Sequence, residues 1–382
     1  METRTFNKTG EEISLLGFGM MRLPSTDEAS LIVDEKTTAA MIGNAIDHGV
    51  NYFDTALPYH NGMSEVVVGK ILSHYPREKF YLADKMPIWL IKSVKEVEEV
   101  FQRQLKTCGV DYFDFYLLHN LSIPKIPRIE AMKAYEYLAR QKKEGKIRHL
   151  GFSFHDTPDA LAMIADQYEW DFAQIQLNYL DWELQNAKRQ YEILTERKIP
   201  VAVMEPIRGG ALADLCPGAV NVLKNASPDA SPASWALRFA ASLPNVFTVL
   251  SGMSKPEQLA DNLRTFENFR PLSEGERKVL DKALDVYRKS APIPCTACRY
   301  CMDCPNGVDI PKNFAIYNRW LTTKNWSDFI SSYFVMEEGK RAVQCIGCGI
   351  CQEKCPQKLD IPGLMPKIEK AFQEIEKPDW FA

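Results

Sequence analysis

Two kinds of segment alternate along most of this chain: short runs rich in β-branched and aromatic residues, and longer segments with apolar residues three or four positions apart. In the clearest longer segment, Phe101, Leu105 and Cys108 keep that spacing, which is typical of a helix buried on one face. Gly109 follows directly, as glycine often does where a helix ends. Helices are therefore expected at 35–48, 64–74, 93–109, 128–144, 157–167, 186–197, 232–242 and 256–268.

The short runs are expected to form eight strands, at 15–20, 50–53, 80–83, 113–118, 148–152, 172–177, 200–204 and 246–250. Eight strands alternating with helices over about 255 residues match a parallel (β/α)8 barrel in both count and length. A doubly wound open sheet also alternates strands and helices, but the G-x-G-x-x-G motif typical of its dinucleotide-binding forms does not follow the first strand here. The pattern thus favours an α/β chain with the barrel fold.

The placement of cysteines divides the chain into two parts. Of its ten cysteines, Cys108 and Cys216 stand alone and the other eight lie between 295 and 355. A further helix and a connector are expected at 273–290. We therefore expect a barrel domain at 1–290 and a small, mainly α-helical, cysteine-rich domain at 291–382, with an aromatic helical insert between its two cysteine runs.

Both cysteine runs have a spacing typical of iron–sulfur ligands. The second run, from Cys345 to Cys355, reads C-x2-C-x2-C-x3-C-P. This is the bacterial ferredoxin spacing, in which three cysteines bind one [4Fe–4S] cube and the fourth binds the neighbouring cube. The first run, from Cys295 to Cys304, reads C-x2-C-x2-C-x2-C-P and is one residue shorter before its last cysteine.

Three interpretations of these runs remain open. In the first, two [4Fe–4S] clusters exchange their fourth ligands. The two ligand sets are then Cys295, Cys298, Cys301 and Cys355 for one cluster, and Cys345, Cys348, Cys351 and Cys304 for the other. In the second, one cluster binds to the second run and the first run is degenerate. In the third, C-x2-C pairs hold structural zinc, which leaves four cysteines without a role.

Composition and charge exclude some classes of function. The chain has 46 Lys and Arg against 50 Asp and Glu, a formal net charge of −4, which argues against a protein whose main task is to bind nucleic acid. No apolar run approaches the roughly 18 residues of a membrane helix, and METRTFNKTGEE has no hydrophobic stretch typical of a secretory signal. In a reducing compartment, clustered thiols more often bind metal than form disulfides. We therefore expect a cytoplasmic protein that binds neither nucleic acid nor membrane.

Polar residues follow three consecutive predicted strands at the end where barrel active sites are built. Asp54 and Lys85 follow the second and third strands, His119 follows the fourth, and Tyr59 comes five residues after Asp54. A lysine ammonium beside a phenol is expected to lower the pKa of the tyrosine, while an aspartate holds the lysine in place. A neutral histidine can orient a carbonyl oxygen. Together the four residues predict a general acid that protonates a carbonyl oxygen as hydride reaches its carbon.

The sequence resembles the aldo-keto reductase family over about residues 5–290. The stretches that carry the resemblance are LGFGMMRLP (16–24), AIDHGVNYFDTALPYHNGMSEVVVGKIL (45–72), LADKMP (82–87), VDYFDFYLLH (110–119), GKIRHLGFS (145–153), QIQLNY (174–179), MEPIRGG (204–210) and SGMSKPEQLADNL (251–263). The resemblance implies a (β/α)8 barrel with NAD(P)H-dependent carbonyl reduction or the reverse oxidation. It implies Asp54, Tyr59, Lys85 and His119 as a catalytic tetrad with Tyr59 as the acid. The cysteine-rich part resembles the α-helical ferredoxin modules found beside redox enzymes.

The same resemblance implies a set of residues around the dinucleotide. They are Gly19, Met20, Met21, Ser153, Gln176, Pro206, Arg208, Gly209, Ser254, Gln258, Asp261 and Asn262. Among them, Ser153 and Gln176 are implied to contact the nicotinamide carboxamide, the loop at 206–210 to cover the pyrophosphate, and the last four to lie near the adenosine. Gln258 stands where many members have an arginine for the 2′-phosphate, so NAD and NADP both stay open. His60, next to the catalytic tyrosine, either touches substrate or caps a loop.

Two hypotheses for the function follow. In the first, the chain is an oxidoreductase that interconverts a small aldehyde or ketone and its alcohol, with iron–sulfur clusters that serve electron transfer or stability and with an electron-transfer protein as a candidate partner. Hydride carries two electrons and each cluster accepts one, so a flavin in the barrel is not excluded. In the alternative, a binding subunit senses the redox state of the nicotinamide and docks a redox partner through its ferredoxin-like tail.

Overall fold

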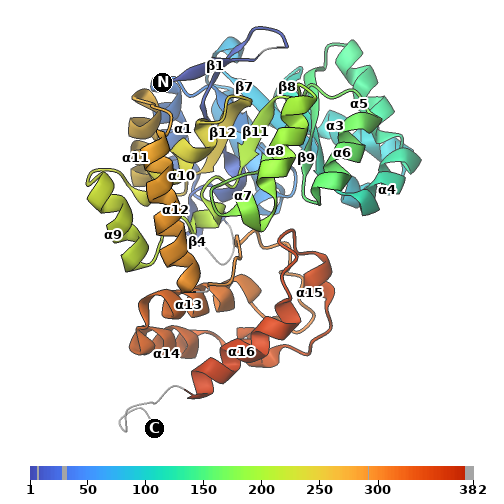
Figure 1. Cartoon of the computed structure of the whole chain (residues 1–382). Coiled ribbons are helices and arrows are strands. Elements are labelled where there is room, and N and C mark those ends of the chain that lie inside the picture. The colour runs from blue at the N-terminus through green and yellow to red at the C-terminus, as the bar shows by residue number, and fades with distance from the viewer. Residues whose placement is uncertain (7, 28–31, 291, 375–382) are drawn as a thin grey trace. The chain divides into compact units, whose positions relative to one another are not determined.

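The computed structural model of the chain describes residues 1–6, 8–27, 32–290 and 292–374 (Figure 1). Its residues pack into two compact units. The first unit consists of Met1–Pro206 and Ala233–Leu272, and the second of Ile207–Pro232 and Ser273–Ala382. No helix among the described residues is both long enough and apolar enough to cross a membrane.

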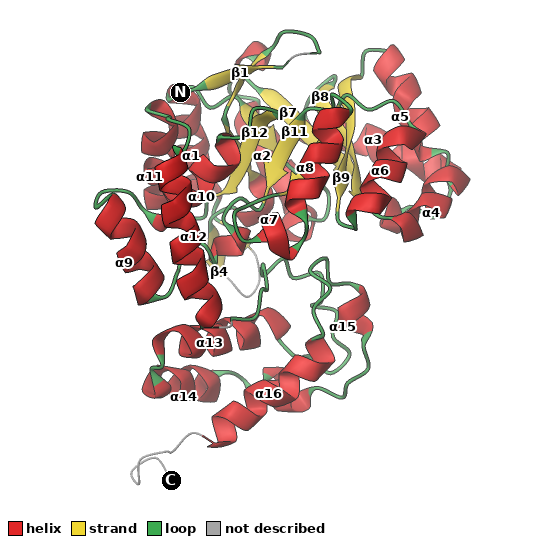
Figure 2. Ribbon diagram, viewed as in Figure 1, coloured by secondary structure: helices red, strands yellow, loops and turns green. Residues whose placement is uncertain are grey.

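A closed barrel of eight parallel strands forms the centre of the first unit, within the described residues (Figure 2). In order around the barrel, the strands are β3 (Leu16–Gly19), β6 (Tyr52–Asp54), β7 (Tyr81–Met86), β8 (Phe113–Leu121), β9 (Ile147–Phe154), β10 (Phe172–Gln176), β11 (Val201–Met204) and β12 (Val246–Gly252). Their residues are almost all buried, as expected for strands covered on both faces. The predicted (β/α)8 fold is confirmed, with a strand at each predicted place.

Helices surround the barrel strands (Figure 2). They are α1 (Glu35–Asp47), α2 (Met63–Leu72), α3 (Val94–Cys108), α4 (Ile126–Ala131), α5 (Ala134–Lys143), α6 (Pro158–Gln167), α7 (Asp181–Leu184), α8 (Ala187–Glu196), α10 (Pro232–Ala241) and α11 (Pro256–Glu267). Helix α3 shows why these segments fold locally: the Ser93 side chain accepts a hydrogen bond from the Glu96 N–H at its start, and Gly109 ends it at φ 66°. The single helix predicted at 128–144 is wrong, because left-handed Lys133 (φ 50°) separates α4 from α5.

An aromatic cluster closes the N-terminal end of the barrel. Phe6 lies between β1 (Thr3–Thr5) and β2 (Glu12–Ser14), which pair as an antiparallel hairpin. The Phe6 ring lies 5.4 Å from the Phe115 ring and 5.0 Å from the Phe247 ring, measured between centroids. All three rings are almost fully buried. Because this end is filled by apolar side chains, a polar site has room at the opposite, C-terminal end of the strands.

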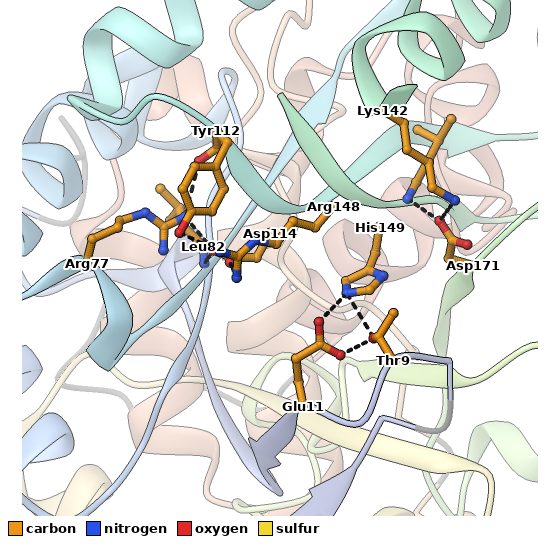
Figure 3. A network of polar contacts seen from close by, with 11 residues as sticks. Thr9, Glu11, Arg77, Leu82, Tyr112, Asp114, Lys142, Arg148, His149 and Asp171 are labelled. Carbon is orange, nitrogen blue, oxygen red and sulfur yellow. Dashed lines mark hydrogen bonds and ion pairs between the residues drawn. The ribbon is translucent and has the colours of Figure 1, made fainter. Parts of the chain in front are cut away.

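Charged side chains fix the strands around this closed end (Figure 3). Asp114, at the start of β8, pairs with Arg77 at 2.5 Å and with Arg148 at 3.0 Å. On the neighbouring strand, buried His149 contacts Glu11 through its Nε2 atom at 3.0 Å. These pairs join segments far apart in sequence, so they specify how the strands meet.

The second unit is small and mainly helical, as predicted. Its helices are α9 (Pro217–Ala226), α12 (Glu274–Lys289), α13 (Ile310–Thr323), α14 (Trp326–Val335), α15 (Ile350–Glu353) and α16 (Ile361–Glu374). Phe314, Phe329, Tyr333 and Met365 are among the residues of its hydrophobic core, and cysteines of both runs pack against that core. Helix α9 was not expected from the hydrophobic pattern of the chain. Packing places 207–232 and α12 in this unit, while the domain boundary at 290 stays a prediction.

We expect Asp114→Ala to destabilise the barrel by about 3 kcal/mol. The substitution leaves two arginines without their buried carboxylate and removes the acceptor of the Leu82 N–H, 2.9 Å away. The urea midpoint of unfolding, followed by far-ultraviolet circular dichroism, measures the loss. Glu196→Ala, which breaks the exposed pair with Arg189, is the control and should cost under about 1 kcal/mol. Equal costs for the two variants would contradict the structural role of Asp114.

Candidate functional site

Three neighbouring strands bring the predicted catalytic residues to the C-terminal end of the barrel. Asp54 is the last residue of β6, Lys85 lies near the end of β7, and His119 lies near the end of β8. Asp54 pairs in register with Ala83, two residues before Lys85. Since side chains alternate along a strand, Lys85 points to the side of the sheet opposite to Asp84.

A short turn carries Tyr59 over the barrel mouth. The 3-10 helix η2 (Tyr59–Gly62) contains His60 and Asn61 in the left-handed region, at φ 50° and 54°, and Gly62 at φ 89°. The His60 Nε2 atom accepts a hydrogen bond from the Leu23 N–H at 3.0 Å. Two roles were predicted for His60, and this contact agrees with the one in which His60 caps a loop. This contact holds the strained turn, and with it Tyr59, in place.

A buried ion pair lies at the centre of the site. The Lys85 ammonium donates to Asp54 Oδ1 at 2.6 Å and to the Thr55 carbonyl oxygen at 2.7 Å. Lys85 is 0 % and Asp54 3 % exposed. Burial raises the pKa of Asp54, and the charge of Lys85 opposes that rise. Two acceptors therefore fix the ammonium where water cannot compete for it.

The electrostatics of Tyr59 correct one expectation. Its ring centroid lies 4.9 Å from the Lys85 Nζ atom. Burial nevertheless raises the pKa of Tyr59 well above 10.0, and anions add to the rise, namely Asp54, Glu205 and Asp84. The expectation that Lys85 lowers the pKa of Tyr59 is therefore wrong for the chain without a bound ligand. Asp54 already pairs with the ammonium, and the effect of burial on the pKa of Tyr59 is larger. Tyr59 therefore stays protonated at neutral pH.

His119 lies between two aromatic rings. Its ring centroid is 6.0 Å from that of Tyr59 and 4.9 Å from that of Trp89. Burial lowers the pKa of His119 well below 6.5, and the charges of Lys85, His155 and Lys125 add to the shift. Among the described residues, its Nδ1 atom has no hydrogen-bond partner. The ring is therefore neutral at pH 7, in agreement with the histidine expected from the sequence.

Three side chains around His119 were not assigned a role from the sequence. Trp89 follows β7, and the Lys125 Nζ atom lies 5.5 Å from the centroid of its ring. Burial lowers the pKa of Lys125 to about 8. Burial, followed by the charge of Lys125, lowers the pKa of His155 to about 4. Their sequence positions follow no catalytic spacing, so only the folded chain reveals them as neighbours of His119.

A second set of buried polar groups holds Lys85 from the outer face of β7. The Lys85 N–H donates to Asp84 Oδ1 at 2.8 Å. Gln104, on α3, donates through Nε2 to the Lys85 carbonyl oxygen at 3.0 Å and to Glu65 Oε1 at 2.9 Å. Burial raises the pKa of Asp84 well above 3.8, and the charge of Glu65 adds to the rise. The backbone that presents the ammonium is thus fixed at both its N–H and its carbonyl oxygen.

Two residues implied to contact the nicotinamide lie at neighbouring strand ends. Ser153, on β9, accepts a hydrogen bond from the Asn120 N–H at 2.7 Å, and its own hydrogen can still be donated. Gln176, on β10, donates to Asp181 Oδ2 at 2.7 Å. Both side chains are buried. Their contacts with a cofactor stay a prediction.

Most other residues implied to bind the dinucleotide gather where β12 and β3 end side by side. Gly19 ends β3, Met20 and Met21 begin the 3-10 helix that follows, and α11 follows β12. Ser254 donates through its hydroxyl to the Arg22 carbonyl oxygen at 2.8 Å. The positions near the start of α11 make hydrogen bonds and ion pairs of their own: Gln258 caps the helix, Asp261 pairs with Arg264 and Asn262 donates to Ser251.

The residues of the loop implied to cover the pyrophosphate do not all belong to the first unit. Pro206 ends the first unit, whereas Arg208 and Gly209 belong to the second. Arg208 is buried, and its Nη2 atom donates to Gln357 Oε1 at 2.8 Å. The role of this loop at a pyrophosphate therefore stays a prediction.

The first cysteine group consists of Cys295, Cys298, Cys301 and Cys355, which line one pocket. Apolar side chains such as Phe314 and Ile361 line it as well. The Ala297 N–H donates to Cys295 Sγ at 3.3 Å. Burial raises the pKa of Cys295 to about 12, and the charges of Cys298 and Cys355 add to the rise. Four sulfur ligands in an apolar pocket with an N–H···S contact fit a [4Fe–4S] cluster.

The second cysteine group consists of Cys304, Cys345, Cys348 and Cys351. Burial raises the pKa of Cys351, and the charges of the other three add to the rise. Cys348 is exposed and lies between Gly347 and Gly349, whose positive φ values of 71° and 79° suit glycine. Among the described residues, no three metal-binding side chains converge on one ion. The ligands of a cube each bind a different iron, so they need not converge.

Comparison with models of protein families gives two matches. Residues 15–285 match the Aldo/keto reductase family. Residues 294–360 match the 4Fe-4S dicluster domain. The first match spans the barrel strands and the second spans both cysteine groups.

Several proteins of known sequence are similar to this chain. An uncharacterized oxidoreductase of Bacillus subtilis (strain 168), YqkF, is 26 % identical over 320 residues, which cover 75 % of this chain and 99 % of that protein. The NADH-specific methylglyoxal reductase of Escherichia coli (strain K12) is 27 % identical over 260 residues, which cover 56 % of this chain and 78 % of that protein.

Solved structures share the fold. The holo form of the aldo-keto reductase AKR11C1 from Bacillus halodurans has a TM-score of 0.61 and 26 % identity, covering 74 % of this chain and 96 % of that one. An aldo-keto reductase from Klebsiella pneumoniae in complex with NADPH has a TM-score of 0.59 and 23 % identity, covering 75 % of this chain and 96 % of that one.

We expect His119 and His155 to stay neutral from about pH 8 to about pH 6, because burial lowers both pKa values. Nitrogen chemical shifts of ring-labelled histidines, assigned with His119→Gln and His155→Gln, measure this. The urea-unfolded chain is the control, in which all six histidines should titrate near 6.5. A midpoint near 6.5 for His119 in the folded protein would contradict the neutral ring.

Proposed function

Because the chain belongs to the aldo/keto reductase family, we propose that it interconverts a small aldehyde or ketone and its alcohol with NADH or NADPH. The observation that carries this proposal is the buried pair of Lys85 and Asp54 beside Tyr59 and His119. Those four side chains supply an acid, a fixed positive charge and a neutral donor at one end of the barrel. Such a set suits a carbonyl whose oxygen gains negative charge.

In the proposed reaction, a bound reduced nicotinamide supplies hydride to the carbonyl carbon. Tyr59 protonates the carbonyl oxygen, since its raised pKa keeps the hydroxyl protonated until the oxygen becomes basic. Lys85 then stabilises the phenolate that remains, because Asp54 holds the ammonium beside the ring. Neutral His119 donates a hydrogen bond to the same carbonyl oxygen and orients it. In the oxidative direction, Tyr59 must first release its proton to water, and the phenolate beside Lys85 then accepts the proton of the alcohol.

We propose that the dinucleotide lies along the part of the barrel rim formed by β9, β10, β11, β12 and β3. The positions of Ser153 and Gln176 on one side, and of Ser254 and Gln258 on the other, support this path. Of the similar proteins, the methylglyoxal reductase of Escherichia coli is described as NADH-specific, and the aldo-keto reductase from Klebsiella pneumoniae was solved in complex with NADPH. Gln258 already caps α11 and carries no positive charge for a 2′-phosphate. Both dinucleotides therefore stay within the proposal.

We propose two [4Fe–4S] clusters, one in each cysteine group. The pocket of the first group supports this assignment, because it is lined by three cysteines of the first run and by Cys355 of the second. The charge of Cys304, which belongs to the first run, contributes to the raised pKa of Cys351 in the second group. Both observations support the exchange of fourth ligands expected from the ferredoxin spacing.

We propose that the clusters both stabilise the second unit and carry electrons to a partner protein. Cysteines of both groups pack against the unit's core, so metal binding and folding are coupled. Exposed Cys348 brings the second group to the surface, where a one-electron partner can approach. Cysteines free of disulfides suit a reducing compartment, so we propose the cytoplasm as its location.

We expect Tyr59→Phe and Lys85→Met to lower kcat/KM for carbonyl reduction by about 10²- to 10⁴-fold, because each removes part of the general acid. Steady-state kinetics over a panel of small aldehydes and ketones measure the loss. Tyr112→Phe, at the opposite end of the barrel, is the matched control and should change kcat/KM by less than about twofold. Wild-type activity in either catalytic variant would contradict the mechanism. A wild-type chain that binds dinucleotide tightly without turnover would favour the redox-sensing subunit.

We expect anaerobically purified protein to hold about eight iron and eight sulfide ions per chain. With exchanged fourth ligands, Cys355→Ser and Cys298→Ser damage the same cluster, and Cys304→Ser and Cys348→Ser damage the other. Paramagnetic resonance of the reduced variants identifies the surviving cluster. Damage to the same cluster in Cys355→Ser and Cys348→Ser would contradict the exchange of fourth ligands. About four irons in the wild type would instead support a single cluster, and flavin analysis of the same sample tests for a bound flavin.

A further inference from the structure

An arginine is buried beside the pocket of the first cysteine group. The side chain of Arg208 is 1 % exposed and is one of the largest fully buried side chains among the described residues. Its Nη2 atom donates to Gln357 Oε1 at 2.8 Å. Gln357 comes two residues after Cys355 and lines the same pocket as the four cysteines. One side chain therefore separates the guanidinium from the pocket.

The backbone around Arg208 is pressed against the first cysteine run. Arg208, Gly209 and Gly210 are left-handed, with φ values of 50°, 62° and 99°. A Cβ atom on Gly209 would lie 2.1 Å from the Thr296 carbonyl oxygen, so the two backbones touch between Cys295 and Cys298. A left-handed conformation is unfavourable for arginine and persists where the surrounding packing fixes it. The position of the guanidinium is thus determined by the fold of this unit.

The charge of Arg208 lies beside the first cysteine group, because Gln357, which accepts its hydrogen bond, lines the pocket of those four cysteines. A guanidinium stays charged at any pH at which proteins fold. In a buried site, a fixed positive charge acts strongly on a neighbouring charge because little water screens it.

We propose that Arg208 raises the reduction potential of the iron–sulfur centre in the first cysteine group. Each reduction adds one electron, and so one negative charge, to that centre. A fixed positive charge nearby stabilises the reduced form relative to the oxidised form, and local charge is one of the factors that set such potentials. The proposal rests on the two clusters of the proposed function. Arg208 thereby makes the reduction potentials of the two centres differ.

The test compares Arg208→Gln and Arg208→Met with Arg208→Lys in the full-length, anaerobically prepared protein. Titration with dithionite and redox mediators, followed by paramagnetic resonance, gives the midpoint potential of each loaded centre. We expect the two neutral variants to lower the equilibrium constant for reducing the first centre about tenfold, which is about 59 mV for one electron. Arg208→Lys keeps the charge and should keep most of the potential. The second centre is an internal control and should not move.

A matched control is Arg319→Gln, which removes an arginine of the same unit from a partly exposed pair with Asp328. It should shift neither centre. Equal potentials in Arg208→Gln and the wild type, or equal shifts of both centres, would overturn the inference. Loss of the first centre in both neutral variants would also overturn it, in favour of a role in holding the cluster. A wild type with one centre would instead contradict the two-cluster proposal.

Discussion

A buried ammonium–carboxylate pair at the barrel mouth is the interaction on which the candidate site depends. Removing two charges from water is costly, and their attraction compensates only when the geometry is good and further hydrogen bonds are made. Lys85 meets both conditions, because Asp54 and the Thr55 carbonyl oxygen accept from its ammonium. Asp84 and Gln104 hold its backbone from the outer face of the strand. The site is therefore rigid before any ligand arrives, as preorganised electrostatic stabilisation requires.

The two units obtain their stability from different sources. The barrel has a large apolar interior and a closed end of interlocking aromatic rings and ion pairs. The second unit has a smaller core, against which the cysteine side chains pack. Small units commonly need a metal or another staple to fold, so loss of a cluster has structural as well as redox consequences. Arg208 belongs to this second unit, and the place at the dinucleotide that the family resemblance implies for it stays a prediction.

The sequence predicted elements that depend on local patterns. Hydrophobic runs gave the eight strands, and parallel strand ends explain why Asp54, Lys85 and His119 gather at one side. Long-range effects were missed. The raised pKa of Tyr59 depends on how deeply its ring is buried, and Trp89 and Lys125 reach His119 from separate loops. Left-handed Lys133 also redirects the chain at a position where the sequence has no glycine.

Direct hydride transfer at the barrel mouth can be followed with a reduced nicotinamide dinucleotide that is doubly labelled with deuterium at C4. Mass spectrometry of the product and of the oxidised cofactor follows the label. We expect one deuterium on the carbinol carbon for each dinucleotide oxidised, with Tyr59 supplying an unlabelled proton to the oxygen. Oxidation of the dinucleotide with the label released to water and an unlabelled alcohol would contradict direct hydride transfer at the barrel mouth.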